Sequence, residues 1–201
     1  RQRQMCIRDS TYTLLQTESL FKEGKHAKGN TKAEAVMLLN HQAALDYVLN
    51  KPDYFRELTV QKILEIHRFL TKGLGIPNKI RSGRVGITGT NYKPLAKANQ
   101  IQKALQDLCD LINSKRNVLE KAFIALLLIA YIQPFEDGNK RTARIICNAL
   151  LLLNKYCPIS FRTVEPEDYR YATLLFYEQN SIPSFKKIFM EHFEFSTANY
   201  F

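Results

Sequence analysis

The segment LEKAFIALLLIAYIQPFEDGNKRTARIICNALLLL, residues 119–153, sets the architecture, because two apolar stretches flank a short polar loop. The first stretch is apolar on nearly every side, which is typical of a helix surrounded by other elements. The second begins after Gly138 with a charged first turn and continues with apolar residues at helical spacing. The sequence therefore predicts two core helices, 118–131 and 138–154, joined by a loop in the middle of the protein.

Start and stop signals predict further helices on both sides of this pair. Thr31 and Glu34 form a capping box that opens a helix ending before Pro52. Thr59 caps another helix, which Gly73 ends. The remaining predicted helices cover residues 12–24, 98–113 and 166–179, and a last one starts at 183. The predicted fold class is all-α, a compact helical domain.

Residues 73–94 have a different texture, with five glycines, two prolines and the β-prone Val85 and Ile87. This composition predicts a long loop that carries a small β-hairpin, with residues 88–91 as its turn. Loops of this length inside a compact domain are usually functional.

Length and composition indicate one folded domain, residues 11–201, with 45% hydrophobic residues and a net charge of 29 − 19 = +10. Residues 1–10 (RQRQMCIRDS) lack periodicity, and we expect a non-native or disordered leader. The longest apolar run, 122–132, is too short for a bilayer, and no secretory signal is recognisable. The four cysteines form no CxxC pair, which favours reduced thiols and a cytoplasmic location, and the four histidines show no zinc spacing.

The loop and the first turn after it carry the residues suited to chemistry. A helix N-terminus attracts anions, and Gly138 permits close approach to the backbone. Arg141 and Arg144 project from the same side, and a guanidinium grips two phosphate oxygens at once. Asp137 could cap the helix or hold a divalent cation. These residues fit a triphosphate cradle, but they equally fit an ordinary buried helix whose first turn is solvated.

The string QPFEDGNKRTAR, residues 133–144, resembles the signature HxFx[D/E]GNGRxxR of the Fic (Fido) family and departs from it at Gln133 and Lys140. GRVGITGTNYKPL, residues 83–95, resembles the flap hairpin of that family. SLFKEG, residues 19–24, resembles its inhibitory helix pattern [S/T]xxxE[G/N].

The resemblance implies a protein adenylyltransferase that moves AMP from ATP onto a Ser, Thr or Tyr hydroxyl of a target protein, with Mg²⁺ as cofactor. It places Gln133 at the general-base position and Asp137 on the metal. The implied nucleotide-binding residues are Gly138, Asn139, Lys140, Arg141 and Arg144, and the implied catalytic set is Gln133, Asp137, Asn139 and Arg141. The implied inhibitory residues are Ser19 and Glu23, with Glu23 pairing with Arg144. The implied target-docking flap contains Thr88, Gly89, Thr90, Asn91 and Tyr92.

The two departures keep alternatives open. The amide of Gln133 cannot hold a proton near pH 7, and losing a general base typically costs about 10²–10⁴ in rate. An impaired adenylyltransferase and an inactive nucleotide-binding regulatory module therefore both fit. Lys140 resembles the Doc-like phosphotransferases, although Gly138 and Arg144 do not. The charge of +10 alone suggests a nucleic-acid binder, but no recognition motif accompanies it, so we expect neither nucleic acid nor membrane as partner. A homodimer is left open.

Overall fold

The structure, a computed structural model, describes residues 31–161 and 164–200. The described residues form seven α-helices and one short 3-10 helix, with no strand among them. In chain order these are α2 (Lys32–Asn50), η2 (Pro52–Phe55), α3 (Val60–Thr71), α4 (Ala98–Ser114), α5 (Val118–Ile132), α6 (Asn139–Leu153), α7 (Pro166–Gln179) and α8 (Pro183–Tyr200). The all-α prediction is confirmed, and the predicted helix bounds differ from these by at most a few residues.

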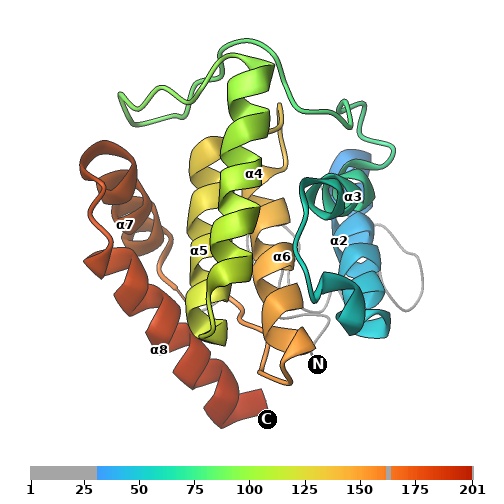
Figure 1. Cartoon of the computed structure of the whole chain (residues 1–201), viewed down its shortest axis with the longest axis vertical. Helices are drawn as coiled ribbons and strands as arrows, with labels where there is room; N and C mark the ends of the chain where they lie inside the picture. The colour runs from blue at the N-terminus through green and yellow to red at the C-terminus, as the bar shows by residue number, and fades with distance from the viewer. Residues whose placement is uncertain (1–30, 162–163, 201) are drawn as a thin grey trace.

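Helices α5 and α6 form the centre of the domain, as the apolar segment 119–153 predicts. They pack against each other, with α4 on α5 and with α2, α3 and η2 on α6. Figure 1 shows α2 and α3 on one side of this pair and α7 and α8 on the other. Most residues of α6 are buried, including the polar Asn139, Thr142 and Arg144 near its start. Burial of polar groups at one end of a core helix marks that end as functional, because buried polar groups need partners.

The helix starts follow the predicted caps. Thr31 and Glu34 form the reciprocal capping box, with the Glu34 amide donating to Thr31 Oγ1 and the Thr31 amide to Glu34 Oε2. Thr59 Oγ1 accepts from the Lys62 amide at the start of α3, and Asn117 Oδ1 accepts from the Glu120 amide at the start of α5. Each cap satisfies amides that no helical carbonyl can reach.

Residues 72–97 form the long loop, but the predicted hairpin is not present in it. A hairpin needs several backbone bonds between two neighbouring segments, and this loop has one across it, from the Gly83 amide to Ala96 O at 2.8 Å. Two further amides bond to distant parts of the chain. The Arg81 amide donates to Pro134 O at 3.0 Å, and the Asn91 amide to Glu178 Oε1 at 3.2 Å. The loop arches over one end of the helices, and its position is set by these distant elements (Figure 1).

Two predicted features lie outside the described residues. They are the leader 1–10 and the helix 12–24 with Ser19 and Glu23. Within the described part of the chain, Cys109, Cys147 and Cys157 are buried free thiols. No helix there has both the length and the apolar character to cross a membrane.

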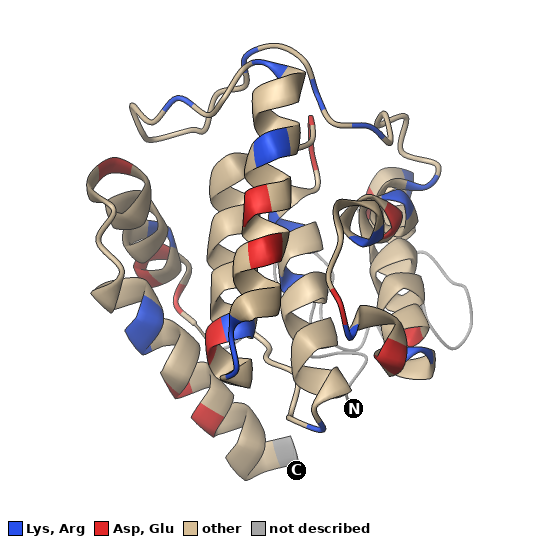
Figure 2. Ribbon diagram, viewed as in Figure 1, with Lys and Arg blue, Asp and Glu red and all other residues tan. Residues whose placement is uncertain are grey.

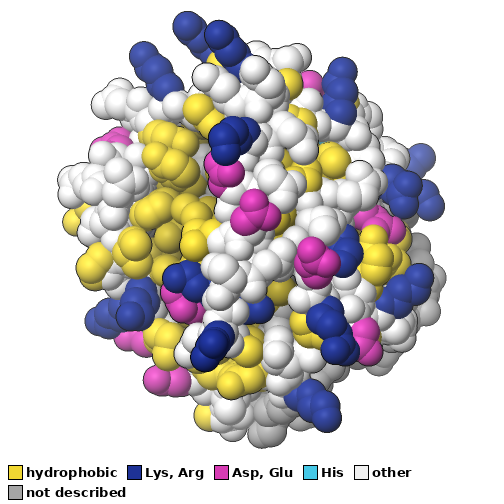
Figure 3. All heavy atoms as spheres, in the orientation of Figure 1, with side chains coloured by type: hydrophobic (Ala, Val, Ile, Leu, Met, Phe, Trp, Pro, Cys, Tyr) yellow, Lys and Arg dark blue, Asp and Glu magenta, His cyan; other side chains and the backbone are white. Residues whose placement is uncertain are grey.

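An apolar groove of about 580 Å³ runs between α5 and α8. Phe123 and Ile124 line it from α5, and Phe189 and Met190 line it from α8. Figure 3 shows apolar side chains gathered over these helices. Glu120 and Lys186 also line the groove, and none of its lining residues belongs to the α5–α6 loop.

Candidate functional site

The site is built on the loop of residues 133–138, between the end of α5 and the start of α6. Gln133 ends α5 in the left-handed conformation, with φ 52°. Phe135 is fully buried, and its ring stacks on the ring of His67 from α3 at a centroid distance of 3.7 Å. The loop therefore turns back into the core at Phe135.

Asn139, the first residue of α6, holds this loop from the inside. Its Oδ1 accepts from the Phe135 amide at 2.9 Å, and its Nδ2 donates to Phe135 O at 2.9 Å. The same Nδ2 donates to Gln133 Oε1 at 3.0 Å. Only 5% of Asn139 is exposed, so water does not readily replace these bonds. Asn139 thus fixes both the loop backbone and the side chain of Gln133.

Gln133 is engaged at both ends of its amide. Its Oε1 accepts from Asn139, and its Nε2 donates to Ala130 O at 2.5 Å. The hydroxyl of Tyr177 lies in the same network, where it donates to Ala130 O at 2.9 Å and hydrogen-bonds with the Gln133 side chain. Burial raises the pKa of the Tyr177 hydroxyl, which therefore stays protonated at neutral pH. Tyr177 is no substitute for a general base.

His67 supports the loop from α3. Its Nε2 donates to Asp137 O at 3.0 Å, and its Nδ1 lies 3.2 Å from the Asn78 side-chain amide. The ring is fully buried, and this burial lowers the pKa of His67, although the bonds to Asn78 and Asp137 act in the opposite direction. His67 is therefore a neutral structural imidazole. With both ring nitrogens engaged, it is not a second candidate base.

Gly138 is the N-cap of α6 and has a φ of +83°, a conformation that side chains rarely adopt. A Cβ at this position would lie 3.4 Å from both His67 Cδ2 and Thr71 Cγ2. The backbone conformation therefore favours glycine here, whereas the surroundings would meet a Cβ at ordinary contact distance. Because glycine has no side chain to cap α6, the positive end of the helix stays open to an anion.

Arg141 lies in the first turn of α6 and pairs with Asp137, with Nη2 and Oδ2 at 2.9 Å. The Arg141 side chain is 17% exposed and the Asp137 side chain 64%. The buried Nη1 of Arg141 has no hydrogen-bond partner within the described residues. A buried guanidinium nitrogen without a partner is costly, and an anionic ligand at this point would satisfy it.

Arg144 and Lys140 complete the charged face. Arg144 is 5% exposed, and its guanidinium carbon lies 5.7 Å from the ring centre of Tyr169. Lys140 is exposed on the turn before it. The structure thus brings the predicted residues of segment 133–144 together at one end of α6. No group of three or more His, Cys, Asp or Glu side chains that could hold a metal occurs within the described ranges.

The predicted flap residues lie in the 72–97 loop and reach the site through Tyr92. The Tyr92 ring stacks on Tyr131 at 4.3 Å, and its hydroxyl donates to Tyr131 O at 3.0 Å. Thr90 Oγ1 accepts from the Tyr92 amide, and Thr88, Gly89 and Asn91 are exposed. Figure 2 shows several Lys and Arg residues along this loop, and its sequence contains no Asp or Glu.

Sequence reasoning missed two buried residues that hold the loop, His67 and Arg81. Arg81 is 1% exposed, and it donates from Nε to Gln133 O and from Nη1 to Gly83 O, both at 2.6 Å. Burial lowers the pKa of its guanidinium. In the sequence, His67 follows Ile66 and Arg81 follows Ile80. A polar residue next to an apolar one is only a weak sign of burial, and the sequence offers no stronger one for these two.

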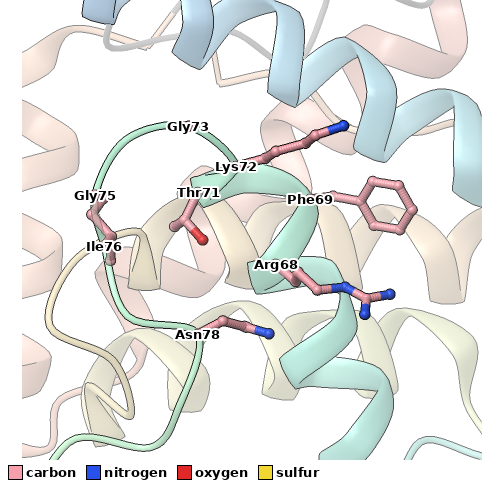
Figure 4. Close-up of a pocket in the computed structure, with 8 residues that line it drawn as sticks. All are labelled: Arg68, Phe69, Thr71, Lys72, Gly73, Gly75, Ile76 and Asn78. Atoms are coloured by element: carbon pink, nitrogen blue, oxygen red, sulfur yellow. The ribbon is translucent and has the colours of Figure 1, made fainter.

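A separate cavity of about 490 Å³ lies where α3 ends, with Arg68, Lys72 and Asn78 among its lining residues. Figure 4 shows that the polar ends of these side chains lie apart from one another. They do not converge on one position, so this cavity is a weaker ligand site than the end of α6.

Residues 57–151, which include the 133–138 loop and most of α6, match the Fic/DOC family. Over these residues the chain is similar to Fic/DOC domains. The protein adenylyltransferase fic-1 of Caenorhabditis elegans is 26% identical over 207 residues, covering 98% of this chain and 39% of the relative. The chain thus spans about two fifths of the length of that relative.

Solved structures show the same fold. Fic-1 of C. elegans (residues 134–508) superposes with a TM-score of 0.78 at 23% identity, over 96% of this chain and 58% of that chain. BepC of Bartonella tribocorum, solved with bound AMPPNP, superposes with a TM-score of 0.57 at 18% identity, over 83% of this chain and 94% of that chain. The all-helical fold of this chain is thus shared with these proteins.

Proposed function

We propose that this chain binds ATP with Mg²⁺ at the amino-terminal end of α6 and is a protein adenylyltransferase whose transfer step is impaired. The observation that carries the proposal is the buried, unpartnered Nη1 of Arg141 beside a helix start that glycine leaves uncapped. Both features favour an anion, and they lie within a domain related to protein adenylyltransferases. A Fic protein solved with AMPPNP supports ATP as that anion.

The residues of the loop suit this ligand. Gly138, Asn139 and Lys140 would line the phosphates, with Arg141 on the inner phosphates and Arg144 on the γ-phosphate. Asp137 is an exposed single carboxylate, the donor that Mg²⁺ accepts together with phosphate oxygens and water. When bound, Mg²⁺ supplies charge neutralisation of the phosphate oxygens. Arg141 would exchange its bond to Asp137 for bonds to phosphate.

In the proposed reaction, the oxygen of a target Ser, Thr or Tyr hydroxyl attacks the α-phosphorus of ATP. The new O–P bond replaces the bond to the bridging oxygen, and pyrophosphate leaves with that electron pair. The hydroxyl proton needs an acceptor, and the amide of Gln133 is a poor one. We therefore expect transfer slower by about 10²–10⁴ than with histidine at this position. Gln133 can still orient a hydroxyl by hydrogen bonding.

A nucleotide-binding module without transfer activity is the second candidate, and a specific observation favours it. The Oε1 of Gln133 accepts from Asn139 and its Nε2 donates to Ala130 O. Both ends of the side-chain amide are therefore already bonded within the protein, and neither is committed to a substrate hydroxyl. A Doc-like transfer of the γ-phosphate is a weaker alternative, because it rests on Lys140 alone.

The flap and the inhibitory helix belong to the same proposal. Residues 88–92 would dock an extended target segment by strand addition, supported by an exposed loop that has no strand partner of its own. Glu23, with Ser19, would inhibit by pairing with Arg144 and so competing with the γ-phosphate. Cys109, Cys147 and Cys157 form no disulfide within the described residues, which supports the cytoplasmic location expected from the sequence.

The test combines binding and transfer in the full chain. Calorimetry with ATP and Mg²⁺ should detect binding in a Glu23→Gly variant, and Arg141→Ala should weaken it by about tenfold or more. Arg116→Ala, which changes an exposed arginine far from α6, is the matched control. Absence of binding in the Glu23→Gly variant would overturn the proposal.

Transfer is measured with ATP labelled in its α-phosphate. Gln133→His in the Glu23→Gly background should give labelled protein at a rate at least about 10²-fold above that of the Gln133 form. If both forms bind ATP and neither transfers AMP, the nucleotide-binding module is the correct reading. If label appears only from the γ-phosphate, the Doc-like reading is correct.

A further inference from the structure

Arg81 is a buried cation with no acidic partner among the described residues. Arg81 is 1% exposed, and both hydrogen bonds of its guanidinium go to backbone carbonyls, those of Gln133 and Gly83. Its Nη2 is buried and has no bond within the described residues. Burying a charge without a carboxylate is unfavourable, so fold stability alone does not explain an arginine at this position.

The two carbonyls belong to two different functional segments. Gln133 opens the 133–138 loop, and Gly83 lies in the 72–97 loop that contains the flap. The Arg81 backbone amide adds a third bond, to Pro134 O at 3.0 Å. Through side chain and backbone together, Arg81 ties the start of the flap to the residue at the general-base position and to the one after it.

Tyr92 ties the other end of the same stretch to the same place. Its hydroxyl donates to Tyr131 O, and its ring stacks on the Tyr131 ring. Residues 82–91 therefore form a loop whose two ends both rest on residues 131–134. A displacement of this loop cannot leave residues 131–134 unaffected unless the bonds at Arg81 and Tyr92 break.

We propose that Arg81 is a positioning residue. It fixes the backbone at Gln133 relative to the flap, so that a target segment bound by the flap is held at a constant position relative to Gln133. The proposal rests on the adenylyltransferase function proposed above. Arg81 touches neither phosphate nor hydroxyl in this arrangement and acts only through Gln133 O, Pro134 O and Gly83 O. The backbone of Gln133 is in the left-handed conformation, which is unfavourable for a residue other than glycine and needs support from its surroundings. The short bond from Arg81 Nε is one such restraint.

The test compares Arg81→Met, which keeps an unbranched side chain but removes every side-chain donor, with Arg81→Lys, which keeps the charge but offers a single donor group. Arg84→Met is the matched control, because Arg84 lies three residues along the same loop and is exposed. All three are made in the full chain, alone and in the Gln133→His, Glu23→Gly background.

Hydrogen exchange is the first readout and does not depend on any transfer. In Arg81→Met, the amides of residues 82–91 and those of residues 131–138 should both exchange at least about tenfold faster than in the parent protein. The exchange rates of helices α4 and α8 should stay unchanged. Arg84→Met should leave both segments as in the parent. Faster exchange in 82–91 alone, with 131–138 unchanged, would overturn the proposal. If Arg81→Met does not fold, Arg81→Lys decides by the same comparison, with a smaller increase expected.

Binding and transfer are the second readout. In the active background, Arg81→Met should lower AMP transfer at least about tenfold while the Kd for ATP with Mg²⁺ changes less than about threefold, and Arg81→Lys should recover part of the rate. A parallel loss of binding and transfer would mean a general structural role and would also overturn the proposal. Absence of transfer in the active background itself would instead refute the proposed function, and the exchange result would still decide whether Arg81 couples the two loops.

Discussion

Replacing Asn139 by alanine should destabilise the protein more than the loss of any single hydrogen bond would. The substitution removes the bonds to the Phe135 amide, to Phe135 O and to Gln133 Oε1. Phe135 is fully buried, so its amide and carbonyl would be left without partners and without water. Each unsatisfied buried group costs about 1–3 kcal/mol, which gives about 3 kcal/mol for the pair after some relaxation.

The assay is equilibrium urea unfolding followed by far-ultraviolet circular dichroism, with thermal unfolding in parallel. A loss of about 3 kcal/mol corresponds to a fall in Tm of about 6–12 °C for a domain of this size. The midpoint in urea should fall while its slope stays constant, because the surface exposed on unfolding is nearly unchanged.

Asn154→Ala is the matched control. Asn154 follows the other end of α6, and its side chain makes one bond, from Nδ2 to Leu150 O at 2.9 Å. Its removal should cost about 1 kcal/mol, a third of the effect at Asn139. Equal losses for the two variants would refute the argument, because they would mean that the Phe135 backbone finds other partners and that Asn139 does not hold the loop.

Three further outcomes follow from the same geometry. Gly138→Ala should lower the free energy of unfolding in urea by about 1–2 kcal/mol, because of its φ of +83°, whereas Gly86→Ala, with nothing within 4 Å and no left-handed backbone, should change it by less than about 0.5 kcal/mol. The lowered pKa of His67 means that the unfolded chain binds a proton below about pH 6.5 that the folded chain resists, so stability should fall as the pH drops below that value. This fall should be smaller in His67→Gln over the same pH range. Burial raises the pKa of the Cys109 thiol to about 12, so alkylation of Cys109 should require unfolding, and mass spectrometry that finds it modified in the native protein would contradict its burial.

The helical framework could be predicted because its signals are local. Caps at Thr31 and Thr59, Pro166 at a helix start and the apolar segment 119–153 each act within a few residues, and the structure follows them. The position of the candidate site was also accessible, because a charged first turn between two apolar stretches is visible in the sequence itself.

The hairpin and the role of Arg81 depend on partners far along the chain. Val85 and Ile87 favour a strand locally, but the backbone around them bonds to Pro134 and Glu178 and to Ala96 O, which accepts from the Gly83 amide. Arg81 is one of six cations in residues 72–97, and nothing in the spacing of the six distinguishes the buried one. Tertiary bonds of this kind decide the conformation where local preference is weak.

Four carbonyls of the loop of residues 133–138 accept hydrogen bonds from donors in other parts of the fold. Gln133 O and Pro134 O accept from Arg81, Phe135 O accepts from Asn139, and Asp137 O accepts from His67. These donors come from three elements, the 72–97 loop, α6 and α3, and the four carbonyl bonds do not involve the side chain at position 133. The backbone that would receive phosphate is therefore built independently of the group that would accept a proton. For this reason Gln133→His should change the rate of transfer while the affinity for ATP stays within about threefold, since only the proton-accepting group differs between the two forms.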